Sequence, residues 1–360
     1  MGSRERRAGD RVTFRLRHET IRLRLREPFR IARAEHGGGR LVTTVIVELE
    51  DDRFPGLVGL GEGYPDRYYG DTPETMAAVF PVLIDAIGEP DPSSAGLHAA
   101  GDAMREVIRW NGGAKCALDS ALHDLVGKAT GRPVWDLLGL SPDIPATDFT
   151  LGLDEPAVVA ERARRAAHFP ALKIKCGGPA DVATLRAVRE VYDGPIRVDA
   201  NTGWTPEVAV GLLPELVALG VELIEQPFPA ARLDWMADLQ ARSELPIVAD
   251  ESCVTDEDLE RLVGVVAGVN VKLAKVGGPG PAARMLARAR ELGFRRFLGC
   301  MEETSVVIAA SAACASLADW ADLDGCLLLA NDPFEGLELG LDHRWQLGDR
   351  PGLGVARRVA

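Results

Sequence analysis

Two lysines stand one residue apart in a short apolar run, ALKIKCGG at residues 171–178, which ends at a pair of glycines. In a β-strand alternate side chains point to the same face, so Lys173 and Lys175 would lie together. Valine or isoleucine normally fills such positions in a buried strand. Lysines that extend from an edge strand into solvent would explain this motif taken by itself. The alternative is an ammonium group placed for acid–base chemistry, which needs further polar residues around it.

Three carboxylates mark the ends of later apolar runs. Asp199 ends IRVD, Glu225 ends LIE and Asp250 follows IVA. Each of them alone would be explained by a helix N-cap or a structural ion pair. Three carboxylates at successive strand ends, however, would repel one another unless a cation lay among them. Ligation by oxygen atoms alone suits Mg²⁺ better than Zn²⁺ or copper, so we predict a Mg²⁺ site.

These residues belong to a regular succession of apolar runs, each ended by a polar residue and followed by a stretch of helical character. Successive run ends are 25, 24, 26, 25, 22, 28 and 24 residues apart, which is the length of a βα unit. Eight such units predict a (β/α)₈ barrel of the TIM type, with its active site where the strands end. An open doubly wound sheet has the same units, but no GxGxxG motif follows the first strand. The run ends are Thr150, Lys175, Asp199, Glu225, Asp250, Lys272, Cys300 and Asp324.

Lys272 ends the sixth of these strands and Lys175 the second, so the two lysines would face each other across a ring of eight. Two bases on opposite sides of a substrate can remove a proton from one face and return it to the other. Each lysine must then be neutral part of the time, and a nearby cation lowers its pKa. Proton abstraction next to a carboxylate fits this set, because a divalent cation would hold the developing enediolate. A Schiff-base aldolase also uses a barrel lysine but does not need three carboxylates.

Composition and chain organisation set limits on this interpretation. The 360 residues carry a net charge of -13, which argues against nucleic acid as the main partner. Six scattered cysteines, a charged N-terminus and no long apolar run lead us to expect a soluble cytoplasmic protein without a secretory signal or membrane span. Alternating strands, then helices from about residue 72, predict an α+β domain over residues 1–135. We expect the barrel over 136–327 and a tail, 328–360, that packs with the N-terminal domain.

Five motifs, taken together, resemble the enolase superfamily and its muconate-lactonizing subgroup over nearly the whole chain. The resemblance implies a capping domain before a modified barrel. It also implies that Lys175 and Lys272 are the acid/base lysines and that Asp199, Glu225 and Asp250 bind Mg²⁺. We interpret Lys275 as a loop or helix-start residue. The motifs are KIK (173–175), DAN (199–201), EQP (225–227), ADES (249–252) and VKLAKVGG (271–278).

Two further stretches, GCMEETS (299–305) and ADLDG (321–325), resemble the dipeptide epimerases of the alanyl-glutamate type. The resemblance implies that Asp322 and Asp324 receive the α-ammonium group of a dipeptide. A solvated turn is the alternative for this Asp-Leu-Asp sequence. Glu303 would brace its loop or a lysine. The expected substrate-binding residues are Lys173, Asp322, Asp324, Glu303 and Thr150.

Two segments of the capping domain, residues 28–40 and 61–74, bear on specificity, and the first resembles the basic segment of the alanyl-glutamate enzymes. Arg33 falls one position from where an arginine that recognises a glutamate side chain would be expected. Three tyrosines would form an aromatic wall, and Asp66 and Asp71 would favour a cationic side chain. The tyrosines are Tyr64, Tyr68 and Tyr69.

The sequence therefore predicts a Mg²⁺-dependent dipeptide epimerase that inverts the α-carbon of the C-terminal residue, and we expect a homo-oligomer. An o-succinylbenzoate synthase, an N-acylamino-acid racemase or a muconate cycloisomerase would use the same base set. A non-catalytic barrel that binds an anion through Mg²⁺ and lysines is a further alternative.

Overall fold

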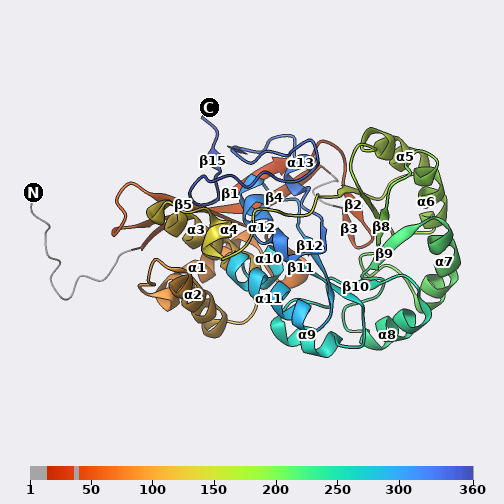
Figure 1. Ribbon diagram of the computed structural model, residues 1–360, viewed down its shortest axis with the longest axis horizontal. Coiled ribbons are helices and arrows are strands. Elements are labelled where there is room, and N and C mark those ends of the chain that lie inside the picture. The colour runs from red at the N-terminus through yellow and green to blue at the C-terminus, as the bar shows by residue number, and fades with distance from the viewer. Residues whose placement is uncertain (1–13, 36–39, 360) are drawn as a thin grey trace, which may run out of the picture.

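The computed structural model describes residues 14–35 and 40–359. An α+β domain built on an antiparallel sheet is followed by a ring of parallel strands with helices on its outer rim (Figure 1). This arrangement confirms the predicted fold class. The basic N-terminal extension and residues 36–39 of the predicted specificity segment lie outside the described residues.

The capping domain packs a three-stranded antiparallel sheet, in the order β1-β4-β5, against three helices. Val45, Val47 and Leu49 alternate along β4 and join the core formed with these helices, whereas Ile46 belongs to the barrel core. The middle of β4 is thus covered on both faces, whereas much of β1 is exposed. The elements are β1 (Phe14–Arg24), β2 (Arg30–Ile31), β3 (Ala34–Glu35), β4 (Leu41–Asp51), β5 (Val58–Gly63), the 3₁₀ turn η2 (Arg67–Tyr69), α1 (Pro73–Ile87), α2 (Ser94–Val107), α3 (Gly112–Thr130) and α4 (Val134–Leu137).

Glycines on one face of β5 set the close approach of α3. A Cβ atom at Gly61 would lie 1.9 Å from the carbonyl oxygen of Ala117, and one at Gly59 would lie 2.1 Å from that of Ala121. Any larger residue would therefore push the helix away. The opposite face of β5 carries Leu60 and Glu62, which are directed to the barrel. β5 thus joins the two parts of the molecule.

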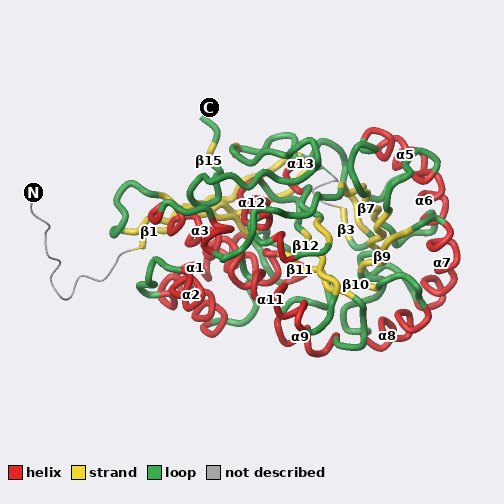
Figure 2. The backbone as a smooth tube through the Cα atoms, viewed as in Figure 1, coloured by secondary structure: helices red, strands yellow, loops and turns green. Residues whose placement is uncertain are grey.

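The barrel contains eight parallel strands in the order of the sequence, from β6 to β13. A parallel bridge between Thr147 and Ala321 joins the two ends of the sheet and closes the ring. Helices α5 to α9 lie around the outside (Figures 1 and 2). The strands are β6 (Phe149–Leu151), β7 (Leu172–Lys175), β8 (Ile196–Asp199), β9 (Val221–Glu225), β10 (Ile247–Ala249), β11 (Gly268–Lys272), β12 (Arg295–Gly299) and β13 (Trp320–Ala321). The helices are α5 (Pro156–Arg165), α6 (Asp181–Arg189), α7 (Pro206–Ala218), α8 (Leu233–Arg242), α9 (Asp256–Leu262), α10 (Leu273–Val276), α11 (Pro279–Glu291), α12 (Ser305–Ala312), the 3₁₀ turn η3 (Ala315–Leu317) and α13 (Gly325–Leu328).

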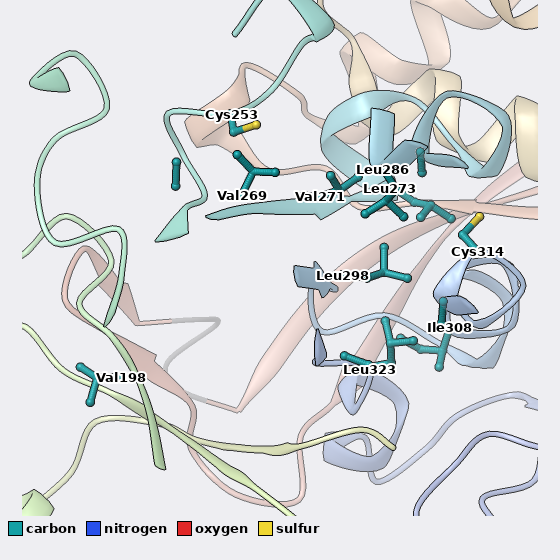
Figure 3. Packing of buried hydrophobic residues seen from close by; sticks show 14 of the residues in the cluster. Val198, Cys253, Val269, Val271, Leu273, Leu286, Leu298, Ile308, Cys314 and Leu323 are labelled. Atoms are coloured by element: carbon teal, nitrogen blue, oxygen red, sulfur yellow. The ribbon is translucent and has the colours of Figure 1, made fainter. Parts of the chain in front are cut away.

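The strand side chains divide into an inner and an outer set. Leu223, Val248, Phe297 and Trp320 come from four strands and form a small separate cluster inside the ring. The alternate residues, such as Val271 and Leu298, join the core between strands and helices (Figure 3). The inward positions nearer the strand ends are polar. The apolar cluster therefore lies inside the barrel beneath the charged residues at its mouth.

The C-terminal segment contacts both parts of the molecule. The backbone of Ala330 bonds to Arg24 of β1, and the backbone of Thr147 bonds to His343. Two short strands, β14 (Phe334–Glu335) and β15 (Ala356–Arg357), pair within this segment. The predicted domain boundaries at 135 and 327 stay predictions. Across residues 14–35 and 40–359, no helix has the length and apolar character to cross a bilayer.

Candidate active site

The strand register places the first predicted residues side by side. Lys175 pairs with Asp199 across β7 and β8, and Asp199 pairs with Glu225 across β8 and β9. All three are the last residues of their strands, so they reach the same mouth of the barrel. The Lys175 Nζ lies 2.7 Å from Oδ2 of Asp199. Asp250 follows the end of β10 directly and extends the arrangement to a fourth strand. Asp199, Glu225 and Asp250 are called the acidic row below.

Lys272 ends β11, four strands from β7 in the ring of eight. Its Nζ lies 3.0 Å from Oδ2 of Asp250. Both Lys175 and Lys272 are buried, at 7% and 5% exposure, and both line the same cavity. The structure therefore sets two amino groups on opposite sides of this cavity, with the carboxylates of the intervening strands along one side.

Lys173 lies below this cavity and does not line it. Its Nζ lies 2.6 Å from Asp322, 2.9 Å from Glu225 and 3.5 Å from Asp199, and only 1% of the residue is exposed. Burial lowers the pKa of Lys173, but the surrounding carboxylates outweigh burial and raise the pKa well above its ordinary value. Substrate binding is the role that the sequence predicts for Lys173. Its geometry instead fits a fixed positive charge that holds carboxylates in place.

The predicted Mg²⁺ ligands face lysines in this structure. No group of three acidic, histidine or cysteine side chains among the described residues converges as a metal-ligand cluster. Each carboxylate instead contacts an ammonium nitrogen: Asp199 that of Lys175, Glu225 that of Lys173, and Asp250 that of Lys272. The donor set nevertheless fits a hard divalent cation, because buried carboxylate oxygens project from three neighbouring strand ends. The ammonium contacts also mean that the pocket already stabilises positive charge.

The charges of this row shift the pKa values in opposite directions. Burial raises the pKa of Asp250, but Lys272 and Lys275 outweigh burial and lower it below its ordinary value. Burial lowers the pKa of Lys272, but the carboxylates, Asp250 first, outweigh burial and raise it. This direction is opposite to the lowered lysine pKa expected from the sequence, because the carboxylates here pair with lysines. A divalent cation on the same carboxylates would withdraw that stabilisation.

Three residues that support the row had no role assigned from the sequence. Lys275 lies in the short helix α10, as a helix-start residue was expected to, but its Nζ contacts Asp250 at 2.5 Å. Asn270, two residues before Lys272 on the same face of β11, donates to Glu225 at 2.6 Å. Gln226 accepts from the backbone nitrogen of Asp250 at 2.8 Å. The period-2 rule could have found Asn270, which shares the face of Lys272, whereas no such pattern indicates Lys275 or Gln226.

The backbone leaves two of the carboxylate strands through uncommon conformations. Asn201 and Thr202 follow Asp199 with φ of 41° and 68°, and Gln226 follows Glu225 with φ of 34°. Non-glycine residues rarely adopt positive φ, and such conformations gather at functional sites. The first of these turns stays at the mouth, because Asn201 lines the cavity.

A cavity of about 360 Å³ lies over this mouth, between the capping domain and the barrel. Arg33, in the turn between β2 and β3, pairs with Glu251 and lies over the Tyr68 ring, 4.2 Å from its centroid. Tyr64 donates to Glu302 at 3.0 Å. The capping residues on the cavity wall are Phe29, Ile31, Arg33, Tyr64, Asp66, Arg67, Tyr68 and Tyr69.

The aromatic wall expected from the sequence therefore lines the cavity, and Asp66 lies there with it. Asp71 does not. Its carboxylate accepts from the backbone of Gly113 at 2.9 Å, at the start of α3, and the residue is buried outside the cavity wall. The expected contribution of Asp71 to side-chain selection is thus not supported by its position.

Asp322 and Asp324 follow β13, which ends at Ala321, so they lie just beyond the strand in which we expected them. Both line the cavity and both contact Thr150 of β6. Asp322 accepts from the Thr150 hydroxyl at 2.8 Å, and Asp324 accepts from the Thr150 backbone nitrogen at 2.6 Å. The charge of Asp322 is already paired with Lys173. Among the described residues no ion pair engages Asp324, so the two carboxylates have different partners.

The electrostatics separate these two carboxylates further. Burial raises the pKa of Asp322, but Lys173 outweighs burial and lowers it below its ordinary value. Burial, together with the charge of Asp322, raises the pKa of Asp324 well above its ordinary value. A cationic group that arrived in the cavity beside Asp324 would oppose this shift and stabilise the ionised carboxylate.

Glu303 braces the loop after β12 from inside. Its Oε2 accepts from the backbone nitrogen of Met301 at 3.0 Å, and the side chain is buried away from the cavity. Glu62 of β5 accepts from the hydroxyl and backbone nitrogen of Thr304, at 2.6 and 3.0 Å, where α12 begins. This contact anchors the capping sheet to the loop that carries Glu302. The structure thus gives Glu303 a bracing position rather than a place on the cavity wall.

The closed barrel, the two opposed lysines, the acidic row and the capping domain over the mouth together form the architecture of a barrel enzyme. The profile described as "Enolase C-terminal domain-like" matches residues 157–358. The profile described as "Mandelate racemase / muconate lactonizing enzyme, N-terminal domain" matches residues 12–139. The chain belongs to this family of the enolase superfamily, as its motifs had indicated.

Individual relatives match along almost the whole chain. The L-Ala-D/L-Glu epimerase of Bacteroides thetaiotaomicron is 37% identical over 339 residues, which cover 93% of this chain and 86% of that protein. The crystal structure of the dipeptide epimerase from Enterococcus faecalis with Mg and L-Leu-L-Tyr superposes with a TM-score of 0.88 and 32% identity, covering 97% and 100% of the two chains. The N-succinyl Arg/Lys racemase of Bacillus cereus has a TM-score of 0.88 and 28% identity, covering 97% and 96%.

Proposed function

We propose that this protein is a Mg²⁺-dependent dipeptide epimerase that inverts the α-carbon of the C-terminal residue of its substrate. One observation carries the proposal: the amino groups of Lys175 and Lys272 enter one cavity from opposite sides of the barrel. A single base would suffice for an elimination, whereas inversion at carbon needs a proton removed on one face and delivered on the other. The likeness to dipeptide epimerases supports the same reaction.

The roles of the side chains follow from their positions. For one stereoisomer Lys175 accepts the α-proton and Lys272 supplies a proton to the opposite face, and for the other stereoisomer the roles exchange. Asp199, Glu225 and Asp250 would hold Mg²⁺, as their buried oxygen donors allow. Mg²⁺ there would neutralise the charge that develops on the substrate carboxylate as the proton leaves. Lys173 and Lys275 keep the carboxylates oriented through the contacts described above.

Asp324 is the residue we propose for the substrate's α-ammonium group. It lines the cavity, and the neighbouring Asp322 is already paired with Lys173. A dipeptide bound with its carboxylate at the acidic row would bring its amino end toward Asp324 and Thr150. A charge-assisted hydrogen bond there would select a free amino terminus over an acylated one.

The test is incubation with a library of L,L-dipeptides and Mg²⁺ in D₂O. Epimerisation exchanges the α-proton of the C-terminal residue with solvent. In the presence of the enzyme one hydrogen atom of the dipeptide is therefore replaced by deuterium, and the mass of the dipeptide increases accordingly. The dipeptides that gain mass identify the accepted side chains. Absence of exchange in every dipeptide, together with turnover of another substrate class, would refute the assignment.

An N-acylamino-acid racemase is the second candidate, because the N-succinyl Arg/Lys racemase has the same fold over nearly its full length. Such a substrate has no ammonium group for Asp324. N-succinyl and N-acetyl amino acids therefore belong in the same D₂O assay. A preference for them over all free dipeptides would favour this second candidate.

The remaining parts of the expected function stay predictions. We expect a homo-oligomer in the cytoplasm that acts without nucleic acid or membrane partners. Sedimentation velocity of the purified full chain would determine its oligomeric state directly.

A further inference from the structure

A second cavity, of about 350 Å³, lies between the capping helices α2 and α3 and the barrel segments around α9, α10 and α11. Its size is that of a small-molecule site. Lys275 and Val276 of α10 form part of its wall. The Nζ of Lys275 contacts Asp250, so this cavity lies directly behind the acidic row of the active site. No residue of the active-site mechanism proposed above lines it apart from Lys275.

The charged groups in this cavity are unevenly paired. Arg105 pairs with Asp256 at 3.0 Å, Arg261 with Asp258 at 3.2 Å, and Arg284 with Asp102 at 3.3 Å. Lys115 and Arg109 also line the cavity. Among the described residues neither of these two has a carboxylate within ion-pair distance.

Lys115 is the more informative of the two, because only 8% of the residue is exposed. Its Nζ donates to the backbone carbonyl of Ile108 at 2.6 Å, which leaves two of its three donors for other partners. Burial lowers the pKa of Lys115 to about 8, Asp71 offsets part of this, and Arg105 adds to it. A buried ammonium group without a counter-ion is costly, and an anion in the cavity would relieve that cost.

The rest of the cavity wall is apolar on one side. Met104 and Met285 are buried there, and Trp110 is 64% exposed as a residue. Trp110 and Asn111 both have positive φ, 59° and 57°, so the loop between α2 and α3 holds this side chain in an uncommon backbone conformation. Aromatic and thioether surfaces suit a flat or flexible apolar group.

We propose that this interdomain cavity is a second binding site, for a small monocarboxylate with an apolar body, whose carboxylate pairs with Lys115 and Arg109. The apolar body packs against Trp110 and the two methionines. Three carboxylates also line the cavity, on Asp256, Glu257 and Asp258. Asp256 and Asp258 are already paired with arginines, so the apolar part of the wall, and not these carboxylates, selects an anion with an apolar body over phosphate.

Isothermal titration calorimetry of the full-length protein at pH 7, where Lys115 is largely protonated, tests the proposal without any turnover assay. The result is thus independent of the proposed epimerase reaction. The probes are benzoate, the uncharged benzyl alcohol, and inorganic phosphate. We expect saturable 1:1 binding of benzoate, with benzyl alcohol and phosphate each at least about tenfold weaker. Absence of saturable benzoate binding, or tighter binding of phosphate, would overturn the proposal.

Variants locate the bound benzoate. Lys115→Met should weaken binding by about tenfold or more, since the charge partner is removed. Arg109→Gln, at an exposed residue, should weaken it by at least about threefold and covers the case in which Lys115→Met does not fold. Lys175→Ala should retain full binding. Arg186→Gln, which removes an exposed charge on α6 far from the cavity lining, serves as the control. Loss of binding in Lys175→Ala with retention in Arg109→Gln would place benzoate in the active site and overturn the inference.

Discussion

The ammonium nitrogen of Lys275 lies 2.5 Å from Oδ1 of Asp250, and the same nitrogen contacts the backbone carbonyl of Asp250 at 2.7 Å. Lys275 thus holds both the side chain and the backbone of this carboxylate from behind the barrel mouth. Because Lys272 contacts the other oxygen of Asp250, the carboxylate is fixed between two lysines. Only Lys272 of the two reaches the active-site cavity.

Replacement of Lys275 should therefore damage the fold and the site together. Lys275→Met leaves a buried carboxylate with one ammonium partner fewer, and removal of one member of a buried ion pair typically costs about 3–5 kcal/mol. We expect a fall of this order in the free energy of unfolding, measured by urea denaturation, and weaker Mg²⁺ binding. Arg186→Gln, which breaks an exposed ion pair with Glu215, should change stability by less than about 1 kcal/mol. Equal effects of the two substitutions would contradict the role of Lys275.

Metal dependence follows from the acidic row. EDTA should abolish turnover, and excess Mg²⁺ should restore it. Asp199→Asn should raise the Mg²⁺ concentration needed for half-maximal activity, because a neutral amide leaves less charge to oppose the cation. The control is Asp234→Asn, at an exposed residue of α8 that pairs with Arg232 at 2.5 Å. Full activity in excess EDTA would contradict the proposed Mg²⁺ site.

Stability should depend on pH through Glu303. Burial, followed by the charge of Glu62, raises the pKa of Glu303 from 4.5 to about 8. The folded protein therefore binds a proton that the unfolded chain releases, so this residue's contribution to stability falls as pH rises from about 4.5 to about 8. Glu303→Gln removes the titration. Its free energy of unfolding relative to the parent should rise by about 1 kcal/mol or more between pH 5 and pH 8. A difference that is independent of pH would show that Glu303 is already ionised at pH 5.

Recognition of a free amino terminus should depend on Asp324. Removal of a buried charge partner typically costs about 2–5 kcal/mol. Asp324→Asn should therefore lower kcat/KM for free dipeptides by roughly a hundredfold, which corresponds to about 2.7 kcal/mol. N-acetylated dipeptides, which lack the ammonium group, should be turned over by the variant as fast as by the parent or slightly faster. An equal loss with both substrate types would indicate a structural role for Asp324, through its contact with Thr150, rather than recognition.

The lysines and carboxylates at the strand ends could be placed from the sequence for two physical reasons. Side chains of a strand alternate between faces, and βα units of similar length bring successive strand ends to one mouth. Lys175, Asp199, Glu225 and Lys272 accordingly end β7, β8, β9 and β11, as the run ends indicated. The capping tyrosines also reached the cavity, since they lie in a loop directly after β5.

Contacts between distant segments could not be placed in this way. Glu62 meets Thr304 across 242 residues, and no local pattern in either segment indicates the other. Lys173 points to the same face of β7 as Lys175. The alternation of side chains along a strand does not show how deep in the barrel each one lies, so the burial of Lys173 beneath the cavity was not foreseen. The buried position of Asp71 outside the cavity wall was not foreseen for a related reason: a loop residue has no periodicity to fix its direction. The role of Lys275 depends on a helix that turns back toward β10.

The opposed lysines are the centre of the account, and stereochemically resolved proton exchange tests them most directly. Lys175→Ala and Lys272→Ala would each be incubated in D₂O with Mg²⁺ and with either epimer of an accepted dipeptide, and exchange at the α-carbon followed by NMR. We predict that neither variant epimerises, that each exchanges the α-proton of only one epimer, and that the two variants select opposite epimers. Epimerisation at the parent rate by either variant, or exchange of the same epimer by both, would contradict the two-base arrangement.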